Sequence, residues 1–150
     1  MINDNVFYKY WYEGFESALK KLDNKNREIL LRECGKACSN SYTKNIYIEE
    51  FNKTGNIPDF LKNLKNRFSE LKYEINEKRN SIIFSYTHCA CDLVTNGFIR
   101  TGLLCDCSRL SLLDNWEAVI GQGNVEVILK QSILKGQEYC IFEIKVKSSW

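Results

Sequence analysis

The clearest structural signal in the chain is NVEVILKQSILKGQEYCIFEIKV, residues 124–146. Two runs in which apolar and polar side chains alternate, 124–133 and 137–146, flank Lys135-Gly136. Successive side chains of a strand point to opposite faces, so alternation predicts strands with one buried face. In the second run the buried face would hold Cys140, Phe142, Ile144 and Val146. The segment therefore predicts a β-hairpin over about 124–147.

A second hairpin is expected upstream, over about 72–87, where Tyr73 and Ile75 alternate with polar residues. Helical spacing of apolar residues covers 6–22, and Asn24 is placed to cap a second helix. Further helices are expected over 46–52, over a segment with Pro58 in its first turn, and from Ser108 to the exit at Gly121. Two hairpins with segregated helices predict an α+β domain: an antiparallel sheet with helices packed on one face.

The size and charge of the chain bound its class. A length of 150 residues predicts one domain, 1–150, with a core of its own. The formal net charge of +2 argues against a nucleic-acid binder, which carries a strong basic excess. No run is apolar enough for a membrane span, and the N-terminus has no secretory signal pattern. We expect a cytoplasmic protein without a membrane or nucleic-acid partner.

The thiols form the main functional signal. The chain has seven cysteines, and four of them lie in the C-x-C pairs Cys89/Cys91 and Cys105/Cys107. The Asn96-Gly97 turn between the pairs could bring them together in a loop over 88–107. Cys34 and Cys38, four apart, would share one helix face. In a reducing compartment such clusters indicate metal binding or catalysis more often than disulfides.

The number of thiols suits a soft metal ion. Four thiolates complete a tetrahedral zinc site, and the two C-x-C pairs supply that number. With Cys34 and Cys38 the count of six would also suffice for a larger cluster, such as an iron–sulfur cluster. Small buried hydrophobes or redox thiols are the alternative. The predicted metal residues are Cys34, Cys38, Cys89, Cys91, Cys105 and Cys107, and the predicted cofactor is zinc.

Two functions fit these residues. One is a binding module in which the ion braces a pocket for a small apolar or heterocyclic molecule. The candidate pocket residues are Phe7, Trp11, Phe15, His88, Trp116 and Cys140. The other is a hydrolase of a small sulfur or nitrogen heterocycle, using a cysteine nucleophile or metal-activated water. Neither G-x-S-x-G nor a phosphate-binding loop occurs. The oligomeric state, monomer or homodimer, is left open.

The closing segment CDCSRLSLLDNWEAVIGQGNVEVILKQSILKGQEYCIFEIKV, residues 105–146, resembles the end of 4-vinyl-reductase-type ligand-binding domains. The shared pattern is a cysteine at a helix head, a glycine-bearing helix exit and a hairpin ending in G-x-x-x-C-x-F. That family shares its fold with heme nitric-oxide sensors and with Golgi transport-particle proteins. The whole chain also resembles small cysteine-rich bacterial proteins related to the L-2-amino-thiazoline-4-carboxylate hydrolase family.

The resemblance implies a zinc site built from a helix-head cysteine, an acidic residue and two hairpin cysteines. The helix-head cysteine matches Cys105 or Cys107, and the final cysteine matches Cys140. The middle cysteine falls on Ser132 and the acidic residue on Leu129, so two family ligands are replaced. Either the metal has moved to the C-x-C pairs or the thiols have another use.

Overall fold

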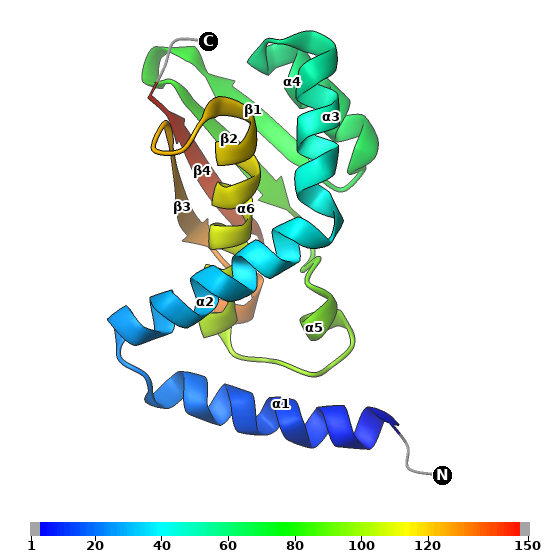
Figure 1. The fold of residues 1–150 in the computed structure, drawn as a ribbon, viewed down its shortest axis with the longest axis vertical. Coiled ribbons are helices and arrows are strands. Elements are labelled where there is room, and N and C mark those ends of the chain that lie inside the picture. The colour runs from blue at the N-terminus through cyan, green and yellow to red at the C-terminus, as the bar shows by residue number, and fades with distance from the viewer. Residues whose placement is uncertain (1–3, 148–150) are drawn as a thin grey trace.

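The computed structural model describes residues 4–147, which form an α+β domain (Figure 1). The α-helices of this part are α1 (Asp4–Lys21), α2 (Asn24–Cys38), α3 (Lys44–Thr54), α4 (Ile57–Arg67), α5 (Asp92–Thr95) and α6 (Cys105–Ile120). The strands are β1 (Lys72–Asn76), β2 (Ser81–Tyr86), β3 (Val125–Gln131) and β4 (Cys140–Val146).

Both predicted hairpins are present and join into one sheet. The strand order is β1-β2-β4-β3, and every neighbouring pair is antiparallel. The hairpins meet where β2 pairs with β4, with Phe84 opposite Phe142. The helices α3, α4 and α6 lie over one face of this sheet (Figure 1). The predicted fold class is confirmed.

The first hydrophobic core fills the space between these helices and the sheet. Trp116 of α6 is fully buried there, as are Phe60 of α4 and Phe84 of β2. Their rings contact edge to face or at a tilt, with centroids 5.4 and 6.0 Å from that of Trp116. Because edge-to-face contact is favourable beyond the area it buries, these aromatics fix α6 on the sheet.

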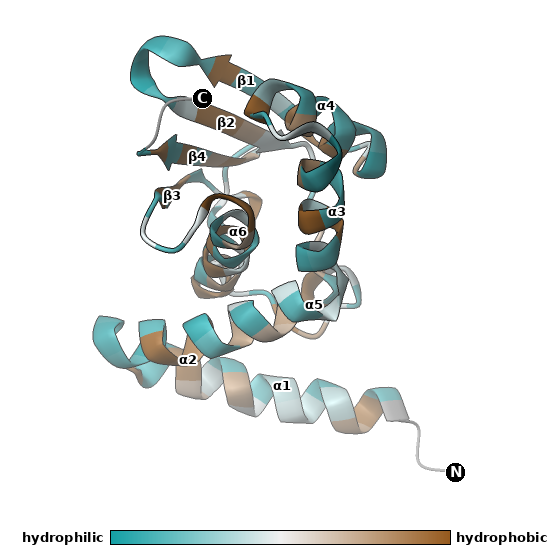
Figure 2. Ribbon diagram, turned by 45° about the horizontal axis from the view of Figure 1, so that its top comes forward, coloured by the Kyte–Doolittle hydropathy of each residue, from teal (hydrophilic) through white to brown (hydrophobic). Residues whose placement is uncertain are grey.

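The second hydrophobic core lies away from the sheet, where α1, α2 and α5 gather around the start of α6 (Figure 2). Its buried members are Leu19, Leu31, Ile99, Leu104 and Leu110. The segment 91–104 therefore contributes apolar packing of its own. The expectation of an open cysteine loop over 88–107 holds only in part, because this segment contains α5 and the 3-10 turn Gly102–Leu104.

Some helix ends differ from the prediction. The helix expected from Ser108 begins at Cys105, because the buried Leu104 and Cys105 anchor its first turn. The cap of α2 is Asp23 rather than Asn24, since the Asp23 carboxylate accepts the Asn26 N–H at 2.8 Å. The other end of α2 continues through the π-helical turn Ser39–Thr43 into α3. The proline prediction is correct: Pro58 lies in the first turn of α4.

The helices α2 and α6 approach most closely at Gly35. A Cβ atom at this position would lie 2.9 Å from the Ser111 nitrogen and 3.0 Å from the Cys107 carbonyl oxygen. Both atoms belong to the backbone of α6 and cannot rotate away. Glycine at position 35 therefore lets the two helix backbones touch, and the neighbouring residues of both helices meet across the contact.

A polar contact holds the π-helical turn beside the same helix. Ser39 is fully buried, and its hydroxyl donates to Asn115 Oδ1 of α6 at 2.6 Å. Thr43 donates to the same oxygen at 3.1 Å. None of the helices within residues 4–147 is long and apolar enough to cross a membrane.

We predict that Gly35→Ala lowers the free energy of unfolding by about 1–3 kcal/mol, the usual cost of forcing a group into a packed contact. The matched control is Gly14→Ala in α1, where an added Cβ meets nothing within 4 Å. That change should raise stability by about 0.5–1 kcal/mol, because alanine loses less backbone entropy in a helix. Urea unfolding of both variants is the measurement, and equal effects would contradict the close contact.

Candidate thiol site

All seven cysteines lie in the described part of the chain, and each is a free thiol. They come from α2, from the segment before α5, from the start of α6 and from the start of β4. These segments are distant in sequence and meet around the first turn of α6. The fold thus gathers the thiols near the N-terminal end of α6.

The first group, called here the Cys107 set, consists of Cys34, Cys38, Cys91 and Cys107. Cys107 lies close enough to the other three for their charges to raise its pKa. Gly35 explains part of this proximity, since it sits against the Cys107 carbonyl, with Cys34 next to it and Cys38 three residues further along the same helix. Cys91 and Cys107 also pack on the same second core. The contact at Gly35 and the shared core thus place α2, Cys91 and Cys107 in one region of the molecule.

The second group, called here the Cys105 set, consists of Cys89, Cys105 and Cys140. Cys105 Sγ lies 2.9 Å from Ser132 Oγ, and the next residue, Ile133, donates its N–H to Cys140 Sγ at 3.5 Å. The thiols of Cys105 and Cys140 therefore contact neighbouring residues, Ser132 and Ile133, of the same turn. Each pair in the set is close enough for one charge to affect the other.

The partners of each C-x-C pair belong to different sets. Cys105 and Cys107 stand in a helix, where residues two apart project about 200° apart. They therefore face different sides of α6 and join different sets. Cys89 and Cys91 lie before α5 and stay close, since the backbone of Cys91 hydrogen-bonds to the Cys89 thiol and Cys89 raises the pKa of Cys91. Cys89 also interacts with Cys105 and Cys140, however, whereas Cys91 interacts with Cys107. The six predicted metal residues are consequently divided as four and two, and Cys140 completes the smaller set.

Burial is the main cause of the electrostatic state of these thiols. It raises the pKa of Cys34, Cys89, Cys91 and Cys105. The pKa of Cys107 is raised furthest, from 9.0 to about 12, by burial first and then by Cys34, Cys38 and Cys91. Removing a proton from Cys107 would place a negative charge in a buried environment, where it is poorly solvated. Without a cation, these thiols are therefore neutral near pH 7.

The donor chemistry suits a soft metal ion, but the thiols are not arranged for one. Within residues 4–147, no three His, Cys, Asp or Glu side chains stand together in a geometry that would hold an ion. Cys38 at the end of α2 is exposed, and Cys34 and Cys91 are half-buried. Closing the Cys107 set around an ion therefore requires thiol side chains to rotate.

The six predicted pocket residues are spread over the molecule. Trp116 is fully buried in the sheet-side core, whereas Phe7 and Trp11 expose 59% and 55% of their surface on α1. His88 Nε2 lies 2.8 Å from Glu70 Oε2, and both side chains are exposed. Phe15 stacks on Trp11 and packs on the second core, and Cys140 belongs to the Cys105 set. These positions do not line a common cavity among those described.

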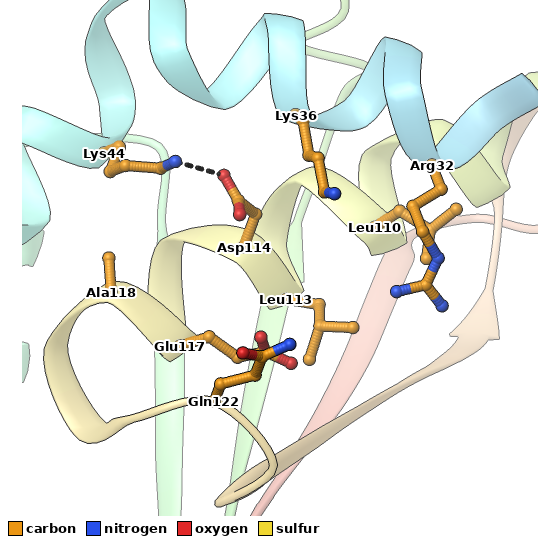
Figure 3. Close-up of a pocket in the computed structure, with 9 residues that line it drawn as sticks. All are labelled: Arg32, Lys36, Lys44, Leu110, Leu113, Asp114, Glu117, Ala118 and Gln122. Atoms are coloured by element: carbon orange, nitrogen blue, oxygen red, sulfur yellow. Dashed lines mark ion pairs between the residues drawn. The ribbon is translucent and has the colours of Figure 1, made fainter.

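A polar cleft of about 360 Å³ lies between α2 and α6 (Figure 3). Arg32 and Lys36 reach into it from α2, and Asp114 and Glu117 face them from α6. Lys44 Nζ lies 2.7 Å from Asp114 Oδ2, an ion pair without hydrogen-bond geometry. Sequence reasoning missed this cleft. The i, i+4 spacing of Arg32 and Lys36 was visible, but not the helix that they would face.

The comparisons with known proteins support the fold. The structure is similar to the crystal structure of a trafficking protein particle complex subunit 3 from Naegleria fowleri, which is covalently bound to palmitic acid. The TM-score is 0.51 and the identity 13%, over 99% of this chain and 97% of that chain. No family model and no curated protein matches the chain. The expected likeness to transport-particle proteins is confirmed for the fold, and the likeness to 4-vinyl-reductase domains stays a prediction.

The raised pKa of Cys107 predicts a loss of stability in alkali. Between pH 9 and about 12 the folded chain keeps a proton on Cys107 that the unfolded chain has released. The folded state then binds more protons, so the free energy of unfolding falls as pH rises through this window. In Cys107→Ala this fall should be smaller than in the parent protein.

Denaturant unfolding at a series of pH values measures the effect. Tyr47 and Tyr86 also have raised pKa values through burial, and both remain in the variant. Comparison with the parent therefore isolates the thiol. An identical pH dependence in the two proteins would show that Cys107 is not buried among other thiols.

Proposed function

We propose that the chain is a metal-binding domain whose Cys107 set holds one zinc ion through four thiolates. The observation that carries this proposal is the convergence of two segments, α2 and the stretch before α5, on Cys107 of α6, which brings Cys34, Cys38 and Cys91 near it. Four thiolates satisfy the tetrahedral preference of zinc. The Cys107 set includes four of the six residues predicted as metal ligands.

Electrostatics gives the physical reason. Each thiol of the set with a resolved shift has a raised pKa, because burial and its neighbours disfavour a negative charge. A divalent cation among these sulfurs would convert that repulsion into attraction and displace the protons. The ion would also tie α2 to α6 and to the segment before α5, so metal binding would stabilise the second core.

The resemblance to 4-vinyl-reductase-type domains supports a metal function but favours other residues. Its helix-head position corresponds to Cys105 or Cys107, and its middle and final positions to Ser132 and Cys140; Cys105 is the match that lies beside the other two. Cys105 contacts Ser132, and Cys140 belongs to the same set. With Cys89 this gives three sulfurs, one fewer than a closed four-sulfur site needs. We therefore assign the first ion to the Cys107 set and treat the Cys105 set as the competing location.

The hydrolase hypothesis has less support. A cysteine nucleophile acts as the thiolate and needs a lowered pKa, usually from a histidine or another cation. The shifts resolved for the cysteines are all upward. His88, which could have served as a base, pairs with Glu70 instead. A small-molecule ligand of the binding module, by contrast, stays part of our proposal, with its identity unassigned.

Cobalt(II) tests the proposal, because tetrahedral thiolate coordination gives intense charge-transfer and visible bands. We expect one cobalt per chain, displaced by zinc, with the spectrum of a four-sulfur site. Cys107→Ser should lower the affinity by more than the 10–100-fold typical of lost outer-shell partners. The matched control is Cys105→Ser, which removes a buried thiol two residues away and should leave the spectrum unchanged.

Two results would contradict the assignment. Loss of the cobalt spectrum in Cys105→Ser but not in Cys107→Ser would place the ion in the Cys105 set. Absence of any thiolate spectrum in the reduced parent protein would remove the metal proposal. A hydrolytic activity abolished by a single cysteine replacement in metal-free protein would favour the hydrolase.

A further inference from the structure

The N-terminal helix carries an unusual concentration of exposed apolar side chains. Five large hydrophobic residues between positions 6 and 11 are about half exposed or more: Val6, Phe7, Tyr8, Tyr10 and Trp11. Soluble monomers rarely leave such residues together in one exposed patch. The other side of α1 is covered: Tyr8 and Tyr12 contact Phe98, and Phe15 and Leu19 pack on the second core, so Tyr8 lies at the edge of the exposed patch. The exposed side of α1 is therefore a candidate interaction surface.

The exposed face has a bulky half and a small half. Phe7, Trp11, Gly14 and Ala18 follow one another at spacings of four, three and four, which place them on one side of a helix. All four are exposed, and the space above Gly14 is open. The first two carry large rings, and the last two carry a hydrogen and a methyl group. The large and the small pair have the same spacing of one helical turn.

From this pattern we propose that α1 pairs with α1 of a second copy of the chain in an antiparallel, two-fold symmetric dimer. Antiparallel pairing sets Phe7 of one copy against Ala18 of the other and Trp11 against Gly14. Both contacts repeat by symmetry, as an interface that uses the same patch twice requires. Each ring enters the space left by a small residue. A parallel pair would instead set ring against ring and leave the small residues apart.

The available area is sufficient for a stable pair. Phe7, Tyr10 and Trp11 expose 59%, 67% and 55% of their surface. Each can therefore bury about 100–150 Å², since an aromatic side chain covers 150–250 Å² in all. The six rings of two copies supply about 800 Å², and the surfaces that they cover bring the total into the range of about 1,200–2,000 Å² of ordinary interfaces.

A lipid surface fits the same face less well. A helix that lies in a membrane interface presents large apolar side chains along its whole length. The second half of this face offers Gly14, Ser17 and Ala18, which have little to insert. A second copy uses both halves, and a membrane would use only one. Binding to vesicles is therefore the alternative that the experiment must exclude.

Sedimentation equilibrium of the full chain between about 1 and 100 µM, a range that spans about 2.7 kcal/mol of association free energy, tests the proposal. The parent should be a dimer at the upper end. Trp11→Ala and Gly14→Trp should each raise the dissociation constant about tenfold or more, the first by losing a ring and the second by filling its space. The double variant should recover much of the loss, because the exchanged residues again pair large with small.

The control is Tyr42→Ala, which removes a ring that is 57% exposed outside α1 and should leave the dissociation constant unchanged. Circular dichroism checks that each variant keeps its helices. The proposal is overturned by a parent that stays monomeric at every concentration. It is also overturned if the double variant loses as much association free energy as the two single variants together. It is also overturned by a monomer that co-sediments with phosphatidylcholine–phosphatidylserine vesicles through Trp11.

Discussion

The direct contact between the backbones of α2 and α6 at Gly35 is the constraint on which the thiol region depends. Helices normally lie 8–10 Å apart because side chains separate them. Here a missing side chain removes that spacer, with 3.0 Å between a Cβ position at residue 35 and the Cys107 carbonyl oxygen. The turns on either side of the contact are thereby brought together. Since Cys34 and Cys38 lie on those turns of α2, their proximity to Cys107 follows from the glycine.

The helix α6, on the other side of this contact, takes part in both hydrophobic cores. The helix α6 contributes Trp116 to the core under the sheet and Leu110 to the core under α1. A change in the position of α6 would therefore alter the packing of both cores. The hydrogen bonds from Ser39 and Thr43 to Asn115 of α6 hold the π-helical turn between α2 and α3 against α6. The thiols thus sit where two packed units share one helix, and an ion bound there would act on both.

The sequence was sufficient for the sheet because its hairpins are local. The alternation over 124–146 and the turn at Gly136 are both visible in the chain, and Gly136 adopts the left-handed conformation that such a turn needs (φ 89°). The sequence was insufficient for the grouping of the thiols. Whether Cys105 and Cys107 face one way or two depends on whether they stand in a loop or a helix. The structure shows a helix that begins at Cys105, directly after Leu104, which is buried in the second core.

The position of Cys140 was also predicted only in part. Its alternation with Phe142 and Ile144 correctly indicated the inward face of β4, but not that Cys105 would lie near it. The pairing of β3 with β4 and the turn that contains Ser132 bring the two together. The closeness of the Cys107 set likewise depends on Gly35, whose role appears only when α6 is in place. A glycine in a helix could equally have marked an exposed or a flexible position.

The most direct test of this account is the map of disulfides that form when the reduced protein is treated with diamide, which oxidises two neighbouring thiols to a disulfide. Peptide mass spectrometry of the briefly treated native chain identifies the pairs. The account predicts that Cys107 links to Cys34, Cys38 or Cys91, and that Cys105 links to Cys89 or Cys140. A dominant bond between Cys107 and Cys140, or between Cys34 and Cys105, would contradict the division of the thiols by α6.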